Sequence, residues 1–243
     1  MNKRITGSSP SFPAPETLQQ EREQLLQNRY EEARKRRQAL LAKLPRHSLA
    51  VIFAAPSQVR SHDTDYPYRQ DSDFYYLTGF TEQNAVLVLA PGRAQGEMVL
   101  FCQPKDKTRE LWDGILTGPE NARELLQVDE AHSVNEIDQI MPRLLDGRQR
   151  VYSCRGQETG FDQRLEQWLT SVRSLVRQGA VCPTEFVMLQ PLVHEMRLIK
   201  SREEIRLCRP PPTFLSGPTG AQCWRLAKGC ANTIWKPNCS TSS

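Results

Sequence analysis

Residues 60–80 hold the densest group of side chains that could do chemistry. Several hydroxyl groups surround a Tyr66-Pro67-Tyr68 turn in this segment. Its four carboxylates belong to Asp63, Asp65, Asp71 and Asp73. Loops rich in carboxylates and aromatic rings are common places for ligand contact when a rigid sheet holds them. We interpret the segment as a ligand-contacting loop, with a cation site as an alternative that no fixed ligand spacing supports.

The familiar catalytic motifs are missing from the sequence. It has no glycine-rich phosphate loop and no nucleophile elbow. His194-Glu195 opens like the helix motif of zinc peptidases, but Leu198 stands where the second histidine would be. Cys154 with a distant histidine could form a nucleophile pair, yet its apolar surroundings favour a buried structural thiol. The residues by themselves therefore predict no catalytic group.

The elements that must position these side chains alternate between strands and helices. Helices are predicted over residues 21–44, 109–116, 120–126, 134–145 and 161–176. Strands are predicted over residues 49–55, 74–80, 85–90, 97–102 and 151–154. Residues 183–193 are read as a connector, with a short turn of helix in it as an alternative. Residues 193–205 are read as a charged extended linker that enters a helix capped by Ser201 and Glu204. The alternation predicts an α/β domain with a mixed β-sheet flanked by helices.

The composition changes abruptly near residue 209. The chain has 32 basic and 28 acidic residues, and its last acidic residue is Glu204. A helix begins at the Ser201 cap, and the proline run 210–212 prevents it from continuing. We therefore expect a disordered lead over 1–20, a domain over 21–180, a linker and helix start over 181–208, and an unrelated, frameshifted tail over 209–243.

Charge and cysteine usage exclude several classes of function. The net charge of +4 comes from the tail, so nucleic-acid binding is not expected, and Arg34-Lys35-Arg36-Arg37 is read as a solvated helix face rather than an anion patch. No apolar run is long enough to span a membrane. Cys102, Cys154 and Cys182 are expected to be reduced thiols, and with a polar N-terminus they predict a cytoplasmic protein.

Four motifs and their order along the chain resemble the amino-terminal domain of aminopeptidase P (Xaa-Pro aminopeptidase), of the creatinase/prolidase group. The resemblance covers about residues 29–207. Its motifs are Arg36-Arg37-Gln38-Ala39-Leu40, Val51-Ile52-Phe53-Ala54-Ala55-Pro56, the segment from Tyr66 to Phe74 with its Leu77-Thr78-Gly79-Phe80 ending, and His194-Glu195-Met196-Arg197-Leu198-Ile199-Lys200-Ser201.

The resemblance implies a second, catalytic domain with two manganese ions held by two Asp, one His and two Glu, releasing an N-terminal residue that precedes proline. No carboxylate follows Glu204, so no manganese and no other cofactor is expected in this chain. The resemblance also places Asp63 where a neighbouring subunit's active site is approached and Trp112 as an aromatic wall of the substrate pocket. Ordinary loop capping and packing are the alternatives for these two residues.

The resulting hypothesis is a truncated Xaa-Pro aminopeptidase, inactive alone, that serves as a substrate-entrance and oligomerisation domain. Its expected partners are further copies of itself or intact aminopeptidase P subunits, and a peptide substrate only in the complete enzyme. The alternative is a stand-alone binding module that associates with itself, with intact enzyme or with an anionic partner.

Overall fold

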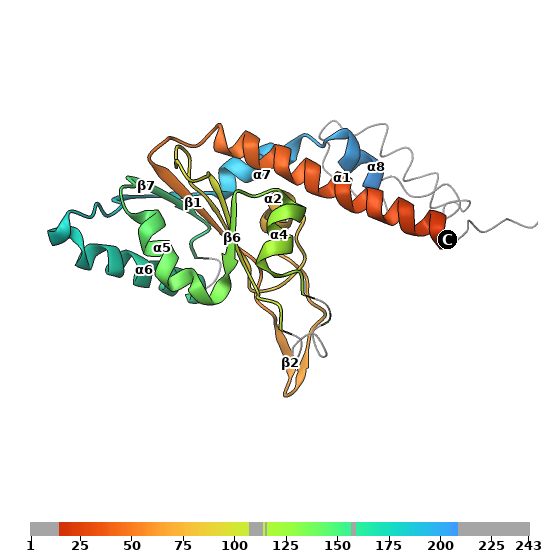
Figure 1. The fold of residues 1–243 in the computed structure, drawn as a ribbon, viewed down its shortest axis with the longest axis horizontal. Coiled ribbons are helices and arrows are strands. Elements are labelled where there is room, and N and C mark those ends of the chain that lie inside the picture. Colours follow the sequence, from red (N-terminus) through yellow and green to blue (C-terminus); the bar gives the residue numbers. More distant parts are fainter. Residues whose placement is uncertain (1–14, 107–113, 115, 157–158, 209–243) are drawn as a thin grey trace, which may run out of the picture. The chain divides into compact units, whose positions relative to one another are not determined.

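The computed structural model of the chain describes residues 15–106, 114, 116–156 and 159–208 (Figure 1). The chain divides into two units, Met1–Met196 and Arg197–Ser243. In the first unit, a six-stranded sheet is flanked by helices on both faces, which confirms the predicted α/β class. Among the described residues, no helix is both long enough and apolar enough to cross a membrane.

The sheet has the strand order β6-β5-β4-β1-β7-β8. Its strands are β1 (Ser48–Phe53), β4 (Val86–Leu89), β5 (Met98–Cys102), β6 (Glu130–Ser133), β7 (Arg150–Ser153) and β8 (Glu185–Met188). Only β4 runs antiparallel to its neighbours, and the other pairings are parallel. Five strands therefore end at one edge of the sheet, which we call the carboxyl edge.

Alternate residues of β1 point to two hydrophobic cores. Ala50 and Ile52 belong to the core that contains residues of α1 (Pro15–Leu41), α2 (Ser72–Thr78), α4 (Gly118–Leu126) and α7 (Gln190–Leu198). Leu49 and Val51 belong to the core that contains residues of α5 (Ile137–Leu145) and α6 (Thr159–Ser174). The short 3-10 helices η1 (Val134–Glu136) and η2 (Val176–Gln178) precede α5 and follow α6. Because both faces of β1 are covered, it reads as a continuous apolar run.

Residues 74–80, predicted as a strand, form helix α2 and its C-cap. The Asp71 carboxylate caps the helix by accepting hydrogen bonds from the backbone of Asp73 and Phe74, both at 2.9 Å. Gly79 ends it in the left-handed conformation at φ 65°. These two caps outweigh the strand preference of the aromatic residues between them.

The region after residue 180 is also more regular than predicted. The supposed connector contains strand β8 and the start of α7, and the supposed extended linker continues α7 to Leu198. In the second unit, α8 (Arg202–Cys208) has the predicted capping box. The Glu204 backbone donates to Ser201 Oγ at 3.3 Å, and the Ser201 backbone donates to Glu204 Oε2 at 2.8 Å.

Two residues of the basic cluster of α1, Arg36 and Arg37, pack against other helices rather than forming a solvated face. Arg37 is fully buried and donates to the backbone carbonyls of Leu77, at 2.8 Å, and Leu126. Arg36 donates to the Tyr76 carbonyl at 3.1 Å and lies over the Tyr76 ring. These carbonyls lie at the C-terminal ends of α2 and α4, where the helix dipole favours a cation. The predicted solvated face is therefore wrong for Arg36 and Arg37.

Candidate functional site

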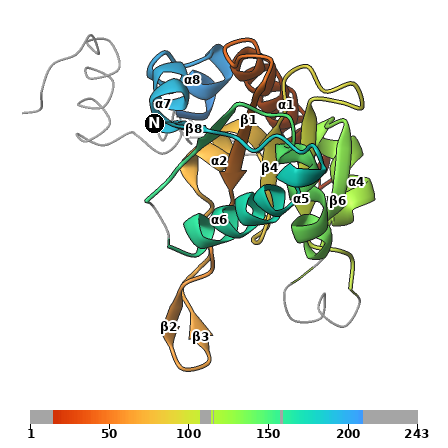
Figure 2. The same cartoon turned by 90° about the vertical axis from the view of Figure 1, so that its left-hand side faces the viewer.

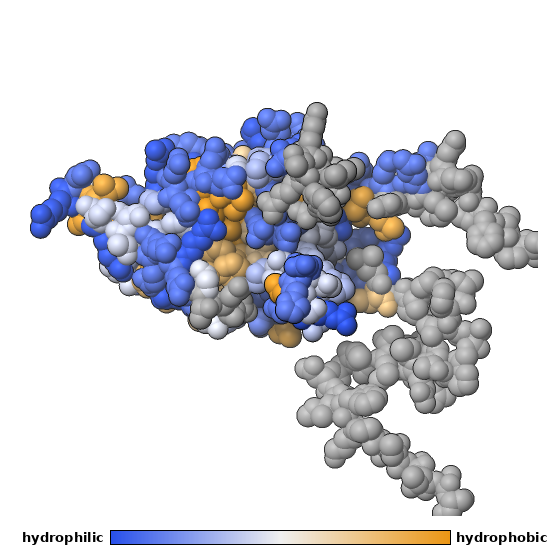
Figure 3. Space-filling view, turned by 90° about the horizontal axis from the view of Figure 1, so that it is seen from below, coloured by the Kyte–Doolittle hydropathy of each residue, from blue (hydrophilic) through white to orange (hydrophobic). Residues whose placement is uncertain are grey.

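A cavity of about 360 Å³ lies at the carboxyl edge, where β1 and β7 end. A second cavity of about 530 Å³ adjoins it and shares Phe53, Ala54, Pro56 and Phe161 with it. Ligands of open α/β sheets commonly bind in the crevice outside the carboxyl ends of the strands. The face seen in Figure 3 is largely hydrophilic, with apolar residues showing in its middle. This position makes the first cavity the candidate functional site.

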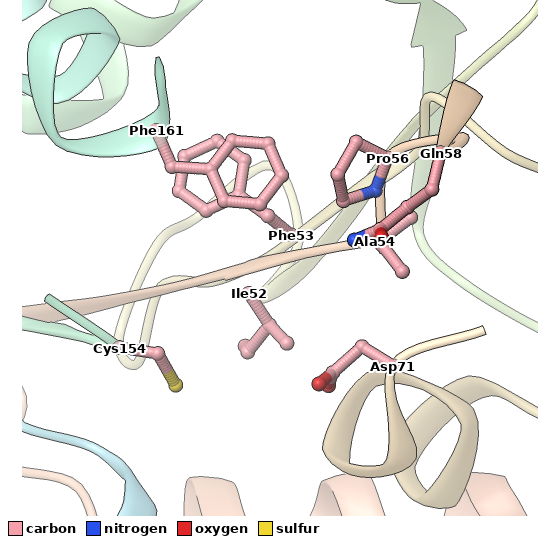
Figure 4. Close-up of a pocket in the computed structure, with 9 residues that line it drawn as sticks. Ile52, Phe53, Ala54, Pro56, Gln58, Asp71, Cys154 and Phe161 are labelled. Carbon is pink, nitrogen blue, oxygen red and sulfur yellow. The ribbon is translucent and has the colours of Figure 1, made fainter. Parts of the chain in front are cut away.

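Stacked aromatic rings form one wall of the cavity. Phe53 extends from the end of β1 and Phe161 from the first turn of α6, and their rings stack with centroids 4.3 Å apart (Figure 4). The ring of Trp168 also stacks with that of Phe53, with the two ring centroids 6.2 Å apart. Its indole nitrogen donates to Asp138 Oδ1 at 2.7 Å. Trp168 is buried, so the stack continues from the core to the cavity wall.

A network of hydrogen bonds holds the loop that borders the cavity. Gln70 Oε1 accepts from the backbone of Ala55 at 2.8 Å and of Asp71 at 2.9 Å. Gln70 Nε2 donates to the Glu82 carbonyl at 2.9 Å, and the Tyr68 hydroxyl donates to the Ala55 carbonyl at 2.9 Å. Burial raises the pKa of Tyr68 to about 12, so the phenol stays protonated and able to donate. Sequence reasoning singled out the aspartates here and missed the anchoring role of Gln70.

Asp71 and Cys154 face the cavity on the side away from the rings (Figure 4). Burial, together with the charges of Asp73 and Asp71, raises the pKa of Cys154 to about 12. A thiol with such a pKa is protonated near neutral pH and is a poor nucleophile. The structure therefore supports the structural interpretation of this cysteine over the catalytic one.

The four aspartates of the acidic segment separate into two places. Asp63 and Asp65 lie in an exposed hairpin made by β2 (Val59–Ser61) and β3 (Thr64–Asp65), with Asp63 in its turn. The hairpin extends from the sheet in Figure 2. Asp71 and Asp73 lie at the start of α2 instead. Trp112, the other predicted pocket residue, lies outside the described residues.

The manganese site implied by the resemblance does not fit the side chains that the structure describes. Within residues 15–106, 114, 116–156 and 159–208, no group of three or more His, Cys, Asp or Glu side chains could hold a metal ion. His194, the residue that opened like a zinc motif, instead contacts Asp73, with Nε2 3.2 Å from Oδ2. This contact joins α7 to α2. Leu198 stands where the motif would need a second histidine.

Comparisons with known proteins give consistent results. The sequence profile described as "Aminopeptidase P, N-terminal domain" matches residues 33–152. The Xaa-Pro aminopeptidase of Escherichia coli is 43% identical over 180 residues, which is 74% of this chain and 41% of that protein. The solved structure of Pseudomonas aeruginosa aminopeptidase PepP superposes with a TM-score of 0.71 at 47% identity, covering 73% of this chain and 40% of that one.

A more distant relative is the mitochondrial Intermediate cleaving peptidase 55 of Arabidopsis thaliana, 30% identical over 181 residues, with 74% of this chain and 34% of that protein covered. The chain thus spans about two fifths or less of the length of these relatives. The matched profile covers the chain from α1 to β7.

Proposed function

The chain belongs to the aminopeptidase P family through its N-terminal domain, and from this membership we propose that it is a non-catalytic domain that shapes a substrate entrance and forms subunit contacts. One observation carries the proposal. The described residues supply the folded N-terminal domain but no group that could hold a metal ion. The family's reaction, manganese-dependent release of a residue preceding proline, would then need metal ligands from outside the described residues.

The exposed hairpin supports a role in subunit contacts. The residues of β2 and β3 are all solvent-exposed, including Val59, which is 67% exposed. An isolated two-stranded hairpin is marginally stable in water, so a partner surface would stabilise it. We propose that Asp63, in its turn, and Trp112 contribute to a substrate pocket completed by another subunit.

The first test is hydrolysis of an Xaa-Pro-Xaa peptide by the purified chain with added Mn²⁺, after mass spectrometry has excluded contaminating intact enzyme. We expect no turnover. Metal-dependent turnover that persists after repurification would contradict the proposal, because it would require a metal site in this chain.

The second test is association. The chain is mixed with an intact Xaa-Pro aminopeptidase and followed by sedimentation velocity at low and high salt. Co-sedimentation at both salt concentrations, weakened by Asp63→Ala but not by Asp146→Ala, is the expected result. Self-association alone, or binding of polyanions that disappears at high salt, would favour the alternative of a stand-alone binding module.

Two accompanying proposals concern the tail and the location. We propose that residues 209–243, which lie outside the described residues, are read from a shifted frame, since they contain no acidic residue and four cationic ones. A nucleotide sequence without a family-like reading in either alternative frame would refute this.

We propose a cytoplasmic location because Cys102, Cys154 and Cys182 are free thiols, and cell fractionation tests it.

A further inference from the structure

The candidate cavity has two chemically different sides. The side formed by the stacked rings of Phe53 and Phe161 is apolar, and Pro56 lies near them. On the other side, Figure 4 shows the Asp71 carboxylate, with Ile52 between it and the rings. A ligand that fills this space must present apolar surface at one end and satisfy a carboxylate at the other.

Asp71 has capacity left for a ligand. Both of its helix-capping hydrogen bonds go to Oδ1, from the backbone of Asp73 and Phe74. For Oδ2, no hydrogen bond is found among the described residues. A carboxylate can accept about four hydrogen bonds, so the second oxygen is available to a donor in the cavity.

The charges around the cavity favour a cation over an anion. No Lys, Arg or His is among the described residues that line it, and Asp71 is their only charged group. The buried Asp73, which contacts His194, also acts on this side of the cavity, since both carboxylates raise the pKa of Cys154. A phosphate or carboxylate ligand would be repelled here, whereas an ammonium or guanidinium group would be attracted.

We propose that this cavity binds a positively charged side chain of a peptide, arginine above lysine, with its apolar stem against Phe53 and Phe161 and its cationic group on Asp71 Oδ2. The proposal goes beyond the family role, because it needs neither a partner enzyme nor hydrolysis. Long cationic side chains combine an apolar stem with a charged end, as the cavity does.

The chain itself contains a similar arrangement. In α6, the Arg164 guanidinium lies over the Trp168 ring, with its carbon 5.6 Å from the ring centroid, and Nε is 3.2 Å from Asp138 Oδ1. The ring and the carboxylate together hold a guanidinium there. The planar guanidinium can also stack on an aromatic face and presents several N–H donors to Oδ2, which is why arginine is preferred.

The test is a calorimetric titration of the full chain with N-acetyl-arginine amide and with N-acetyl-citrulline amide, its uncharged near-isostere. We expect arginine amide to bind at least about tenfold more tightly than citrulline amide. A peptide with a central arginine, blocked at both ends, should bind at least as tightly as the amide. This arm distinguishes a peptide ligand from a free amino-acid derivative.

Three variants locate the site. Asp71→Asn keeps the helix cap but removes the charge, and should weaken arginine binding about tenfold while leaving citrulline binding unchanged. Ala55→Leu, which adds bulk at the cavity wall, should abolish both. Asp65→Asn, an equivalent change in the exposed hairpin, is the control and should change neither. Circular dichroism confirms that each variant is folded.

Three results would each overturn the proposal. They are equal binding of the arginine and citrulline amides, no binding of either amide at a concentration about tenfold below its solubility limit, and undiminished arginine binding by Asp71→Asn. None of these results would bear on the family role, which the hydrolysis and association tests address separately. Conversely, arginine binding without association would leave the cavity site standing and remove the subunit role.

Discussion

Replacing Arg37 tests how α1 is joined to the rest of the domain. Its guanidinium is fully buried and donates to the carbonyls of Leu77 and Leu126, near the ends of α2 and α4. Carbonyls in the last turn of a helix have no partner within the helix. One side chain thus satisfies the ends of two helices, and Arg37→Ala would leave both buried carbonyls without this donor.

The size of the effect can be worked out from three contributions. Two buried carbonyls without donors cost about 2–6 kcal/mol together, and the cavity left by the missing stem adds about 2–3 kcal/mol. Removing the cation also removes the cost of burying it. Burial lowers the pKa of Arg37 from 12.5 to about 10, which corresponds to about 3 kcal/mol. The net destabilisation expected for Arg37→Ala is therefore about 3 kcal/mol.

Arg37→Met separates these contributions. The methionine retains most of the apolar stem, so the cavity cost largely disappears and a net loss of about 1 kcal/mol is expected. Lys35→Ala is the control, because Lys35 is 68% exposed in its side chain and pairs with Glu32 in the same helix. This change should alter stability by less than about 0.5 kcal/mol.

The assay is urea unfolding of the full chain, followed by circular dichroism, with the free energy of unfolding extrapolated to water. We expect the order Lys35→Ala, Arg37→Met, Arg37→Ala from least to most destabilised. A loss below about 1 kcal/mol for Arg37→Ala would refute the idea that its hydrogen bonds hold the two helix ends. Equal losses for the alanine and methionine variants would show that the carbonyls, not the stem, set the effect.

Three further changes have defined outcomes. Asp71→Ala should lower the free energy of unfolding by about 1 kcal/mol through loss of the α2 cap, and Asp71→Asn by only a few tenths, as measured by urea unfolding. Burial raises the pKa of Cys102 and Cys154 from 9.0 to about 12. The stability they contribute is therefore complete below about pH 9 and lost as the pH rises to about 12, so replacing both with alanine should flatten the measured decline over that interval. Gly96→Ala should destabilise by about 2 kcal/mol or more, because φ is +132° and a Cβ would lie 2.4 Å from Asp129 Cβ; an unchanged urea midpoint would contradict this.

Hydrophobic patterns in the sequence correctly predict the elements whose apolar residues follow one clear pattern. The run from Leu49 to Ala55 lies largely in β1, and the apolar stripe after Phe161 lies largely in α6. These segments are either covered on both faces or amphipathic, so their patterns carry the assignment. The mixed sheet also followed from the order of strands and helices.

The errors have specific physical causes. The α2 segment is short, aromatic and mostly buried, so its apolar residues do not show the helical period, and only Asp71 and Gly79 mark its ends. Strand β6, with the sequence Glu-Ala-His-Ser, is a polar edge strand with no apolar alternation. Strand β8 is mostly exposed at the opposite edge. Tertiary pairing, rather than local preference, places both edge strands.

The cavity could not have been predicted from the sequence. It combines Phe53 from β1, Asp71 from the α2 cap, Cys154 after β7 and Phe161 from α6. These residues meet only because β1 pairs with β7 in one register, and no sequence pattern gave that pairing. The sequence singles out Asp71 for its carboxylate, but it indicates only packing for Phe53 and Phe161 and a buried structural thiol for Cys154.

The pairing of β1 also has a consequence for synthesis on the ribosome. Ser48 must find Arg150, about a hundred residues later, before the centre of the sheet is complete. Synthesis adds about 5–20 residues per second, so β1 remains without its neighbour β7 for about 5–20 s. Pairings so distant in sequence also fold slowly. The nascent chain is therefore a candidate for chaperone binding during that interval, with Leu49 and Val51 among the residues that stay uncovered longest.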